Sequence, residues 1–268
     1  TLGVANTYTG ATSITAGTVS VTNAAGINTS SALTVNGGTL DINNVALNTL
    51  ASVNIQGTGA AGVGALTGTG AGAAYAGPIT LDGATTIGGA GTLTLSGAIT
   101  DGASTFALNK SGAGTLVLSS ANTYDGGTNV TAGVLNLQNA TAAGTGTVAV
   151  TSGAAVQVQG GITVANALTL NGTGVATDGA LRSISGANTW SGAITEGSDS
   201  RINTDLNSLA LTGGITNAGF LTTVGGSGNT AINTTALGGT GGLTKDGSGT
   251  LTLGVANTYT GATSITAG

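Results

Sequence analysis

Short segments of this chain alternate between aliphatic and polar residues. Examples are residues 92–95 (Thr-Leu-Thr-Leu), 115–118 (Thr-Leu-Val-Leu) and 134–137 (Val-Leu-Asn-Leu). A period of two places successive side chains on opposite faces of a β-strand, so each segment has one aliphatic and one polar face. Gly, Asn and Asp lie between the segments, where turns with positive φ are needed. The pattern predicts many short strands joined by turns.

Pairs of aliphatic residues recur at a nearly constant spacing where the series is unbroken. Consecutive pairs lie 19 to 21 residues apart, and we expect them to point inward: Val19/Val21, Leu40/Ile42, Leu116/Leu118, Leu135/Leu137 and Val156/Val158. A period of this length is typical of coils that stack through backbone hydrogen bonds. We therefore predict an all-β fold, a right-handed parallel β-helix (β-solenoid) with about 20 residues per coil and about 12–13 coils.

A long internal repeat organises the sequence. Residues 1–17 (TLGVANTYTGATSITAG) are identical to residues 252–268, which are displaced by 251 positions. Identity over so long a stretch is typical of a tandem array. We interpret 1–268 as one continuous solenoid segment of an array with period 251, and we expect it to be a mature fragment or an excerpt because it does not begin with Met.

The period contains two sub-repeats, about 1–116 and 117–251, followed by 252–268, which repeats 1–17. Tyr8 and Tyr124 are 116 positions apart, whereas Lys110 and Lys245 are 135 apart. The second sub-repeat is thus longer by 19 residues, which are added between about 217 and 244. That length is about one coil, and adding a whole coil keeps every later strand facing the same way.

Composition excludes several kinds of chemistry. Only 5% of the residues are charged, the net charge is −5, and Cys, His and Met are absent. Disulfides, thiolate zinc sites and histidine catalysis are therefore excluded. Four scattered cations, Lys110, Arg182, Arg201 and Lys245, make nucleic acid a poor partner. No run of 18 apolar residues is present, so we expect no membrane-spanning helix.

One motif combines fixed glycines, alternating leucines and a single aromatic residue. It is present in residues 110–133 and 245–268, and 1–17 supply a third, partial copy. Its residues are Gly114, Leu116, Leu118, Asn122, Tyr124 and Gly126, with the counterparts Gly249, Leu251, Leu253, Asn257, Tyr259 and Gly261. The motif resembles the passenger-associated β-strand repeat of bacterial autotransporters and giant repetitive surface proteins. This resemblance implies a parallel β-helix, export across the outer membrane, display on the surface of a Gram-negative-type cell, and no catalytic residues.

Each Tyr and Trp precedes a glycine by two positions. These residues are Tyr8, Tyr75, Tyr124, Trp190 and Tyr259. One interpretation is a ring that packs in a recurrent turn beside a glycine with positive φ. The alternative is a set of surface-binding aromatics that stack on sugars. Asparagines lie two residues before four of these rings, at Asn6, Asn122, Asn188 and Asn257, and we expect them to hydrogen-bond the same turns.

Candidate catalytic or metal-binding groups are few. Only Glu196, Asp199, Arg201 and Asp205 form a local charged group, and we expect a solvated loop there rather than a paired acid site or a calcium site. The threonine rows, such as Thr92/Thr94 and Thr250/Thr252, fit exposed strands better than an ice-binding face, because the coil sequences are irregular. We predict no enzyme activity, no metal and no cofactor.

The leading functional hypothesis is a structural one. We expect a repeat of a giant extracellular fibre or adhesin stalk that stacks end to end on adjacent copies of itself. Low charge also favours lateral self-association into fibres or a sheath. The alternatives are a carbohydrate- or surface-binding adhesin face, for which glycans would be partners, and a polysaccharide-cleaving β-helix enzyme.

Overall fold

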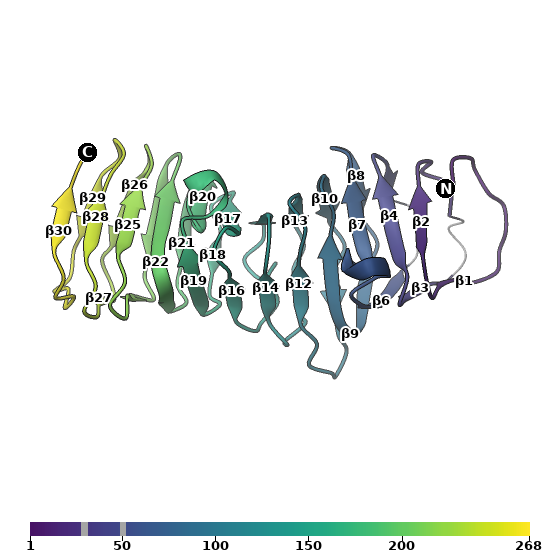
Figure 1. Cartoon of the computed structure of the whole chain (residues 1–268), viewed down its shortest axis with the longest axis horizontal. Coiled ribbons are helices and arrows are strands. Elements are labelled where there is room, and N and C mark those ends of the chain that lie inside the picture. The colour runs from purple at the N-terminus through teal and green to yellow at the C-terminus, as the bar shows by residue number, and fades with distance from the viewer. Residues whose placement is uncertain (28–31, 49–51) are drawn as a thin grey trace. The chain divides into compact units, whose positions relative to one another are not determined.

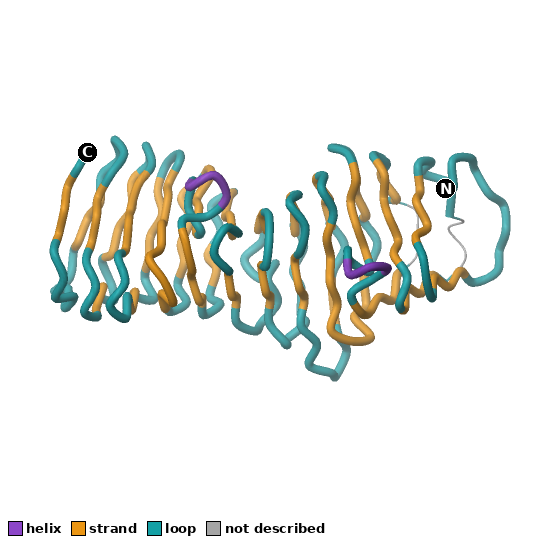
Figure 2. Tube along the Cα trace, in the orientation of Figure 1, coloured by secondary structure: helices purple, strands orange, loops and turns teal. Residues whose placement is uncertain are grey.

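The chain is an all-β parallel β-solenoid of about 12 turns with about 21 residues per turn. It is seen in a computed structural model that describes residues 1–27, 32–48 and 52–268. Strands dominate the trace, and short 3-10 turns at Ala60–Gly62 (η1) and Val175–Thr177 (η2) are the helical segments of these described residues (Figure 2). The predicted fold class, coil length and coil number are confirmed. The predicted continuous segment also covers 28–31 and 49–51, which lie outside the described residues, and the right-handed winding stays a prediction.

Two compact units make up the chain, and each is described by itself. Unit 1 comprises Thr1–Leu135 and Thr141–Gly146, and unit 2 comprises Asn136–Ala140 and Thr147–Gly268. The division thus falls later in the sequence than the predicted boundary between sub-repeats at 116/117. A strand, β15 (Val134–Leu137), lies at the division itself.

Unit 1 consists of three parallel ladders of strands. The strands are β1 (Thr12–Ile14), β2 (Thr18–Val21), β3 (Leu33–Asn36), β4 (Thr39–Asn43), β5 (Ala46–Leu47), β6 (Val53–Gly57), β7 (Leu66–Thr69), β8 (Ala73–Tyr75), β9 (Ile79–Gly88), β10 (Thr92–Leu95), β11 (Ile99–Thr100), β12 (Leu108–Lys110), β13 (Thr115–Leu118) and β14 (Thr128–Val130). The ladders run β1–β3–β6–β9–β11, β2–β4–β7–β9–β12–β14 and β5–β8–β10–β13. The long strand β9 belongs to two of them because it continues through a corner of the coil.

Unit 2 repeats this arrangement. Its strands are β16 (Val148–Val150), β17 (Ala155–Gln159), β18 (Thr163–Val164), β19 (Leu168–Gly172), β20 (Leu181–Ser185), β21 (Ala187–Trp190), β22 (Ile194–Thr204), β23 (Ser208–Leu211), β24 (Ile215–Thr216), β25 (Thr222–Gly225), β26 (Asn229–Ile232), β27 (Leu237–Gly238), β28 (Leu243–Lys245), β29 (Leu251–Leu253) and β30 (Thr263–Ile265). The ladders are β16–β19–β22–β24–β27, β17–β20–β22–β25–β28–β30 and β18–β21–β23–β26–β29. Figure 1 shows β22, β25, β28 and β30 following one another in this unit.

Aliphatic side chains stack in columns inside each coil. In β10 and β13 the register pairs Leu93 with Leu116 and Leu95 with Leu118, and all four side chains are at most 1% exposed. Burying each such side chain contributes about 1.5–3 kcal/mol. The predicted inward pairs are confirmed as buried, except that Val19 is only half-buried.

The last copy of the motif differs from this pattern. Leu251 is half-buried and Leu253 is 39% exposed, although they correspond in sequence to Leu116 and Leu118. Both lie in β29, which pairs with β26 on one side and has no strand on the other among the described residues. Leu253 is therefore not enclosed as its counterpart Leu118 is, because no coil of this chain covers the far side of β29.

The additional residues of the second sub-repeat form one complete coil. Strands β24, β25 and β26 lie between the coil of β22 and β23 and the coil of β27, β28 and β29, and every pairing stays in register. Thr222 pairs with Leu243, and Thr230 pairs with Leu251, so each step covers one turn of the solenoid. The one-coil interpretation of the longer sub-repeat agrees with this register.

Replacing Leu116 by Asp tests the interior columns. The substitution places a carboxyl without a polar partner in the column of Leu93 and should lower the free energy of unfolding by at least about 3 kcal/mol. Urea unfolding measures the loss, and Thr115→Asp on the opposite, half-exposed face of β13 is the matched control. Equal effects of the two substitutions would contradict the inward assignment.

Deleting a whole coil tests the register. Removal of 223–243 joins Thr222 to Thr244, which is the residue that pairs with Thr223, so all later strands keep their faces. Removal of only 223–232 joins Thr222 to Asn233, so that turn residues take the place of β25 and the later segments no longer pair with the coil before them. We expect the first variant to keep its β-sheet circular dichroism and protease resistance and the second to lose both. Equal tolerance would mean that the coil is not the unit of this fold.

Candidate functional site

The central copy of the motif closes around a buried tyrosine. Tyr124 lies in the connection between β13 and β14, and its ring is fully buried. Its hydroxyl lies 2.7 Å from Thr128 Oγ1, which itself donates to the Ala143 carbonyl at 3.0 Å. Since the threonine proton is used in this way, the phenol donates to Thr128. Burial raises the pKa of Tyr124 above its usual range, so the donor proton is retained.

The same tyrosine–threonine bond occurs in the other two copies. Tyr259 and Thr263 are joined at 2.7 Å, and Thr12 Oγ1 lies 3.0 Å from the Tyr8 hydroxyl. In each copy the threonine follows the tyrosine by four residues and belongs to the next strand. The bond therefore fixes the turn that leads into β1, β14 and β30.

Asn122 connects three successive coils of unit 1. Its Oδ1 accepts the backbone N–H of Ile99 at 2.8 Å, and its Nδ2 donates to the Ala142 carbonyl at 2.6 Å. The side chain is 2% exposed, so both bonds lie in a nearly dry environment. The amide takes the place of a peptide unit in the ladder between neighbouring coils.

The other asparagines before the aromatic residues bond to backbone in the same manner. Asn257 Oδ1 accepts from the Leu237 N–H at 2.8 Å, and Asn6 Nδ2 donates to the Gly26 carbonyl at 2.7 Å. Asn188 Oδ1 accepts two backbone N–H groups, from Gly161 and Ile162. Asn6, Asn188 and Asn257 also donate to backbone carbonyls two or three residues away, as expected of turn asparagines. The bonds of Asn122 differ from this expectation, because they go to the coils on either side.

A lysine in the motif caps backbone carbonyls. Lys110 is 1% exposed, and its Nζ donates to the carbonyls of Ser111, Gly112 and Ala132 at 2.8–2.9 Å. Burial lowers the pKa of this ammonium to about 8. Lys245 donates in the same way to Asp246, Gly247 and Ala267. The spacing of 135 in the sequence marks both lysines as one repeated position, but the sequence does not indicate the carbonyls that they cap.

A family model describes these segments. It is the passenger-associated-transport-repeat, and it matches residues 1–21, 108–137 and 243–268. These three segments of the chain are similar to the passenger-associated-transport-repeat. The matches include the tyrosine and its threonine in all three copies and the lysine in the second and third. No curated protein and no solved structure matches the chain.

The match implies an autotransporter passenger β-helix repeat with a structural or adhesin-like role. The repeat is typical of structural segments with an extracellular or surface location. In the described part of the chain, no helix has the length and apolar character needed to cross a bilayer.

Three of the glycines that lie two positions after an aromatic residue have a different role from the one expected. Gly126, Gly192 and Gly261 do not have positive φ. A Cβ on Gly126 would lie 2.3 Å from the carbonyl carbon of Phe106, and one on Gly192 would lie 1.9 Å from the Asn166 oxygen. These glycines are required because the neighbouring coil approaches too closely for any side chain.

Three of the five aromatic rings are closed to solvent. Tyr75, Tyr124 and Trp190 are at most 1% exposed, which corrects the hypothesis of sugar-stacking aromatics at these positions. The rings fill the interior of the coil, and their polar atoms bond to nearby groups: the Tyr75 hydroxyl to the Pro78 carbonyl and Trp190 Nε1 to the Asn166 carbonyl. Tyr8 is 37% exposed and Tyr259 is half-buried, each in a terminal coil of the described chain.

The local charged group of the second sub-repeat does not form one site. Glu196 points into the interior and is 1% exposed, whereas Asp199 accepts the backbone N–H of Leu221 at 2.8 Å. Arg201 pairs with Asp246, and Asp205 pairs with Arg182. The expected solvated loop is wrong for this segment, because all four residues lie in or beside the long strand β22 and bond to neighbouring coils. Among the described residues, no cluster of three or more acidic side chains could hold a metal ion.

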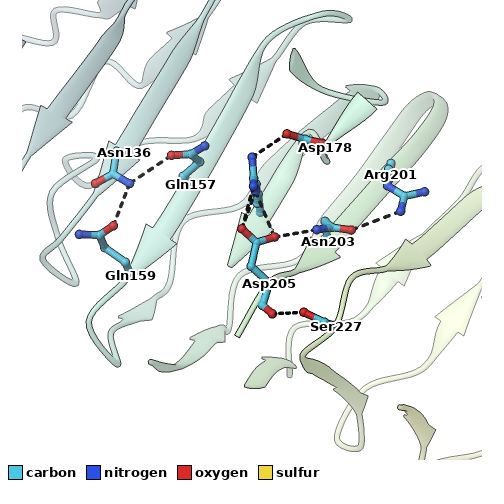
Figure 3. A network of polar contacts seen from close by, with 9 residues as sticks. Asn136, Gln157, Gln159, Asp178, Arg201, Asn203, Asp205 and Ser227 are labelled. Atoms are coloured by element: carbon cyan, nitrogen blue, oxygen red, sulfur yellow. Dashed lines mark hydrogen bonds and ion pairs between the residues drawn. The ribbon is translucent and has the colours of Figure 1, made fainter. Parts of the chain in front are cut away.

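The outward face of unit 2 instead carries an extended polar network (Figure 3). Arg182 contacts Asp178 at 2.9 Å and Asp205 at 2.8 Å, and Asn203 donates to Asp205 at 2.8 Å. Arg201 donates to Asn203 and forms a two-pronged pair with Asp246 at 2.6 and 2.8 Å.

Two further sets of polar contacts in Figure 3 join adjacent coils. Asn136 lies beside Gln157 and Gln159, and Ser227 donates to the Asp205 carbonyl. The carboxylates Asp178, Asp205 and Asp246 are all occupied by arginine. Acids neutralised in this way are unsuited to general acid–base chemistry, and the network holds coils together instead.

Replacing Asn122 by Ala tests the inter-coil amide. The substitution leaves the buried Ile99 N–H and the Ala142 carbonyl unpaired and should reduce the free energy of unfolding by about 2–4 kcal/mol. Thermal and urea unfolding measure the change. Asn6→Ala is the control, because its amide connects fewer coils and should cost about 1 kcal/mol or less. A loss at Asn122 no greater than at Asn6 would contradict the bridging role.

Proposed function

We propose that this chain is a structural period of a long extracellular β-solenoid, a stalk or fibre segment that stacks end to end on further copies of its own sequence. One observation carries the proposal. The identical segments 1–17 and 252–268 present complementary faces, each burying residues that the other exposes.

The two copies meet different neighbours. In the C-terminal copy, β30 pairs with β28, so that Thr263 lies opposite Leu243. In the N-terminal copy, β1 pairs with β3, so that Thr12 lies opposite Leu33. Because the two sequences are identical, together they describe both faces of a single coil in a continuous array.

Side-chain exposure supports the same arrangement. Ile14 is 3% exposed where β3 covers it, but its counterpart Ile265 is 72% exposed. Conversely, Val4 is 67% exposed, whereas its counterpart Val255 is half-buried. A following coil with the sequence of 18–48 would cover Ile265 as β3 covers Ile14, and this burial would contribute about 1.5–3 kcal/mol.

We extend the proposal to lateral association, because little charge opposes it. The net charge is −5 over 268 residues, and Arg182 and Arg201 are already paired within the chain. Electrostatic repulsion between neighbouring solenoids should therefore be weak. The proposed location, a fibre on the surface of a Gram-negative-type cell, is supported by the similarity to passenger-associated-transport-repeats.

A chain of two tandem periods, 1–251 followed by 1–268, tests the stacking. In the tandem chain, residues 263–265 at the junction are followed by a further coil, whereas in the single period they are not. Their amides should therefore exchange hydrogen at least tenfold more slowly in the tandem chain than in the single period. Ile265→Asp at the junction is the control and should abolish the gain. Sedimentation of the same chain at increasing concentration reports lateral association.

Unchanged exchange at the junction, or independent unfolding of the two periods, would contradict end-to-end stacking. Sedimentation as a single species at every concentration would contradict bundling while leaving the stacking intact.

A further inference from the structure

The interior of unit 2 contains one acid without a counter-ion. Glu196 belongs to β22, is 1% exposed, and points into the coil beside the column position of Leu170. Its Oε2 accepts a hydrogen bond from Thr222 Oγ1 of the next coil at 2.9 Å. Its Oε1 is buried without a hydrogen-bond partner. An ionised carboxylate in such a place would be only partly solvated.

A second unpartnered atom lies in the next coil. Ile194 and Thr195 pair with Ile215 and Thr216, and one step further along the two strands come Glu196 and Asn217. Asn217 is fully buried, its Oδ1 accepts the Gly241 N–H at 2.9 Å, and its Nδ2 has no partner. The corner thus holds an unpaired carboxyl oxygen and an unpaired amide N–H at matching positions of successive coils.

The first sub-repeat builds the same corner without the acid. Strand β9 corresponds to β22 in length and course, and Leu81 stands where Glu196 stands. Thr85 pairs with Leu108 as Ser200 pairs with Thr222. The fully buried pair Leu81 and Leu108 is therefore replaced by the hydrogen-bonded pair Glu196 and Thr222.

The corner of unit 1 shows that Glu196 is not needed to build the fold. Because Leu81 and Leu108 are both fully buried at this position of unit 1, the fold does not require a polar pair there. Both leucines are replaced together, one by Glu196 and the other by Thr222. This indicates that the hydrogen bond between the two new side chains is the feature that distinguishes the corner of unit 2.

The charged groups near Glu196 do not neutralise it. Strands β19, β24 and β25, which pair with β22, carry no charged residue. Strand β20 carries Arg182, whose guanidinium is occupied by Asp178 and Asp205. On β22 itself, Arg201 is paired with Asp246, and the nearby negative charge of Asp199 disfavours ionisation further.

We propose that Glu196 is a proton-binding site that holds the coils of β22 and β25 together when protonated and loosens them when ionised. In the neutral state the carboxyl group fits the interior with its bond to Thr222. In the charged state the carboxylate must draw in water, which opens the corner between 196 and 222.

The direction of the pH effect follows from burial. Desolvation raises the pKa of Glu196 to about 8, from 4.5 in the unfolded chain. Between these values the folded chain binds one more proton than the open one, so stability is full at acidic pH and falls as the pH rises toward 8. Over that window the opening equilibrium constant of this region should increase about tenfold per pH unit.

Hydrogen exchange between pH 6 and pH 8, corrected for intrinsic rates, tests the proposal on the full chain. Amides of β22 and β25 should open about tenfold more per pH unit in the wild type. The matched control is the double substitution Glu196→Leu/Thr222→Leu, which reproduces the corner of Leu81 and Leu108. In this variant, and in Glu196→Gln, the opening of these amides should not depend on pH.

Equal pH dependence in the wild type and both variants would overturn the proposal, as would a wild-type opening constant that is flat from pH 6 to 8. A carboxyl-carbon NMR titration of the wild type gives an answer that does not require any variant to fold. Ionisation of Glu196 near pH 8 is the expected result, and ionisation near 4.5 would also overturn it.

Discussion

The structure depends on parallel backbone pairing between successive coils. Each strand inside the described ladders uses its N–H and C=O groups on the coils to either side, whereas end strands such as β29 and β30 pair on one side only. Columns such as Leu93 and Leu116 therefore run along the stack, with each side chain resting on the equivalent one of the next coil. Every other feature has to preserve this register.

The motif residues extend the same pairing to the places where strands end. At the turn after β13 the peptide ladder is interrupted, and Asn122 supplies an amide in its place. Lys110 satisfies three carbonyls that point into a turn, and Tyr124 donates to the threonine that opens the next strand. The passenger-associated-transport-repeat is thus a way of closing a turn without leaving buried backbone groups unpaired.

The sequence predicted the fold well because two periodicities acted together. Alternation within β13 fixed which side chains face inward, and the recurrence of such segments fixed the coil length. The role of Gly126 was not predicted, since a glycine needed for close approach and a glycine needed for positive φ look the same in a sequence. The sequence likewise did not decide whether Trp190 and Tyr75 are buried, because an aromatic residue near a turn can lie on either face of a strand.

The acidic group was harder to predict for a physical reason. Glu196 and Asp199 are three residues apart, yet one is buried and the other bonds to a turn of the neighbouring coil. Burial alternates along β22, so Glu196 faces inward with Ile194 and Ile202, and Asp199 faces outward. The sequence hides this alternation because an acid and a serine stand at inward positions where aliphatic residues are expected, and the segment therefore resembles a polar loop.

The coil added by β24, β25 and β26 has a consequence for how such a protein changes its length. Because register survives only whole turns, length is quantised, and gene insertions or deletions are tolerated in steps of about 21 codons. Adding or removing whole coils therefore changes the length of the solenoid while the contacts between neighbouring coils stay the same. A family built in this way should vary in length by recombination between copies far more readily than it varies in the shape of a single turn.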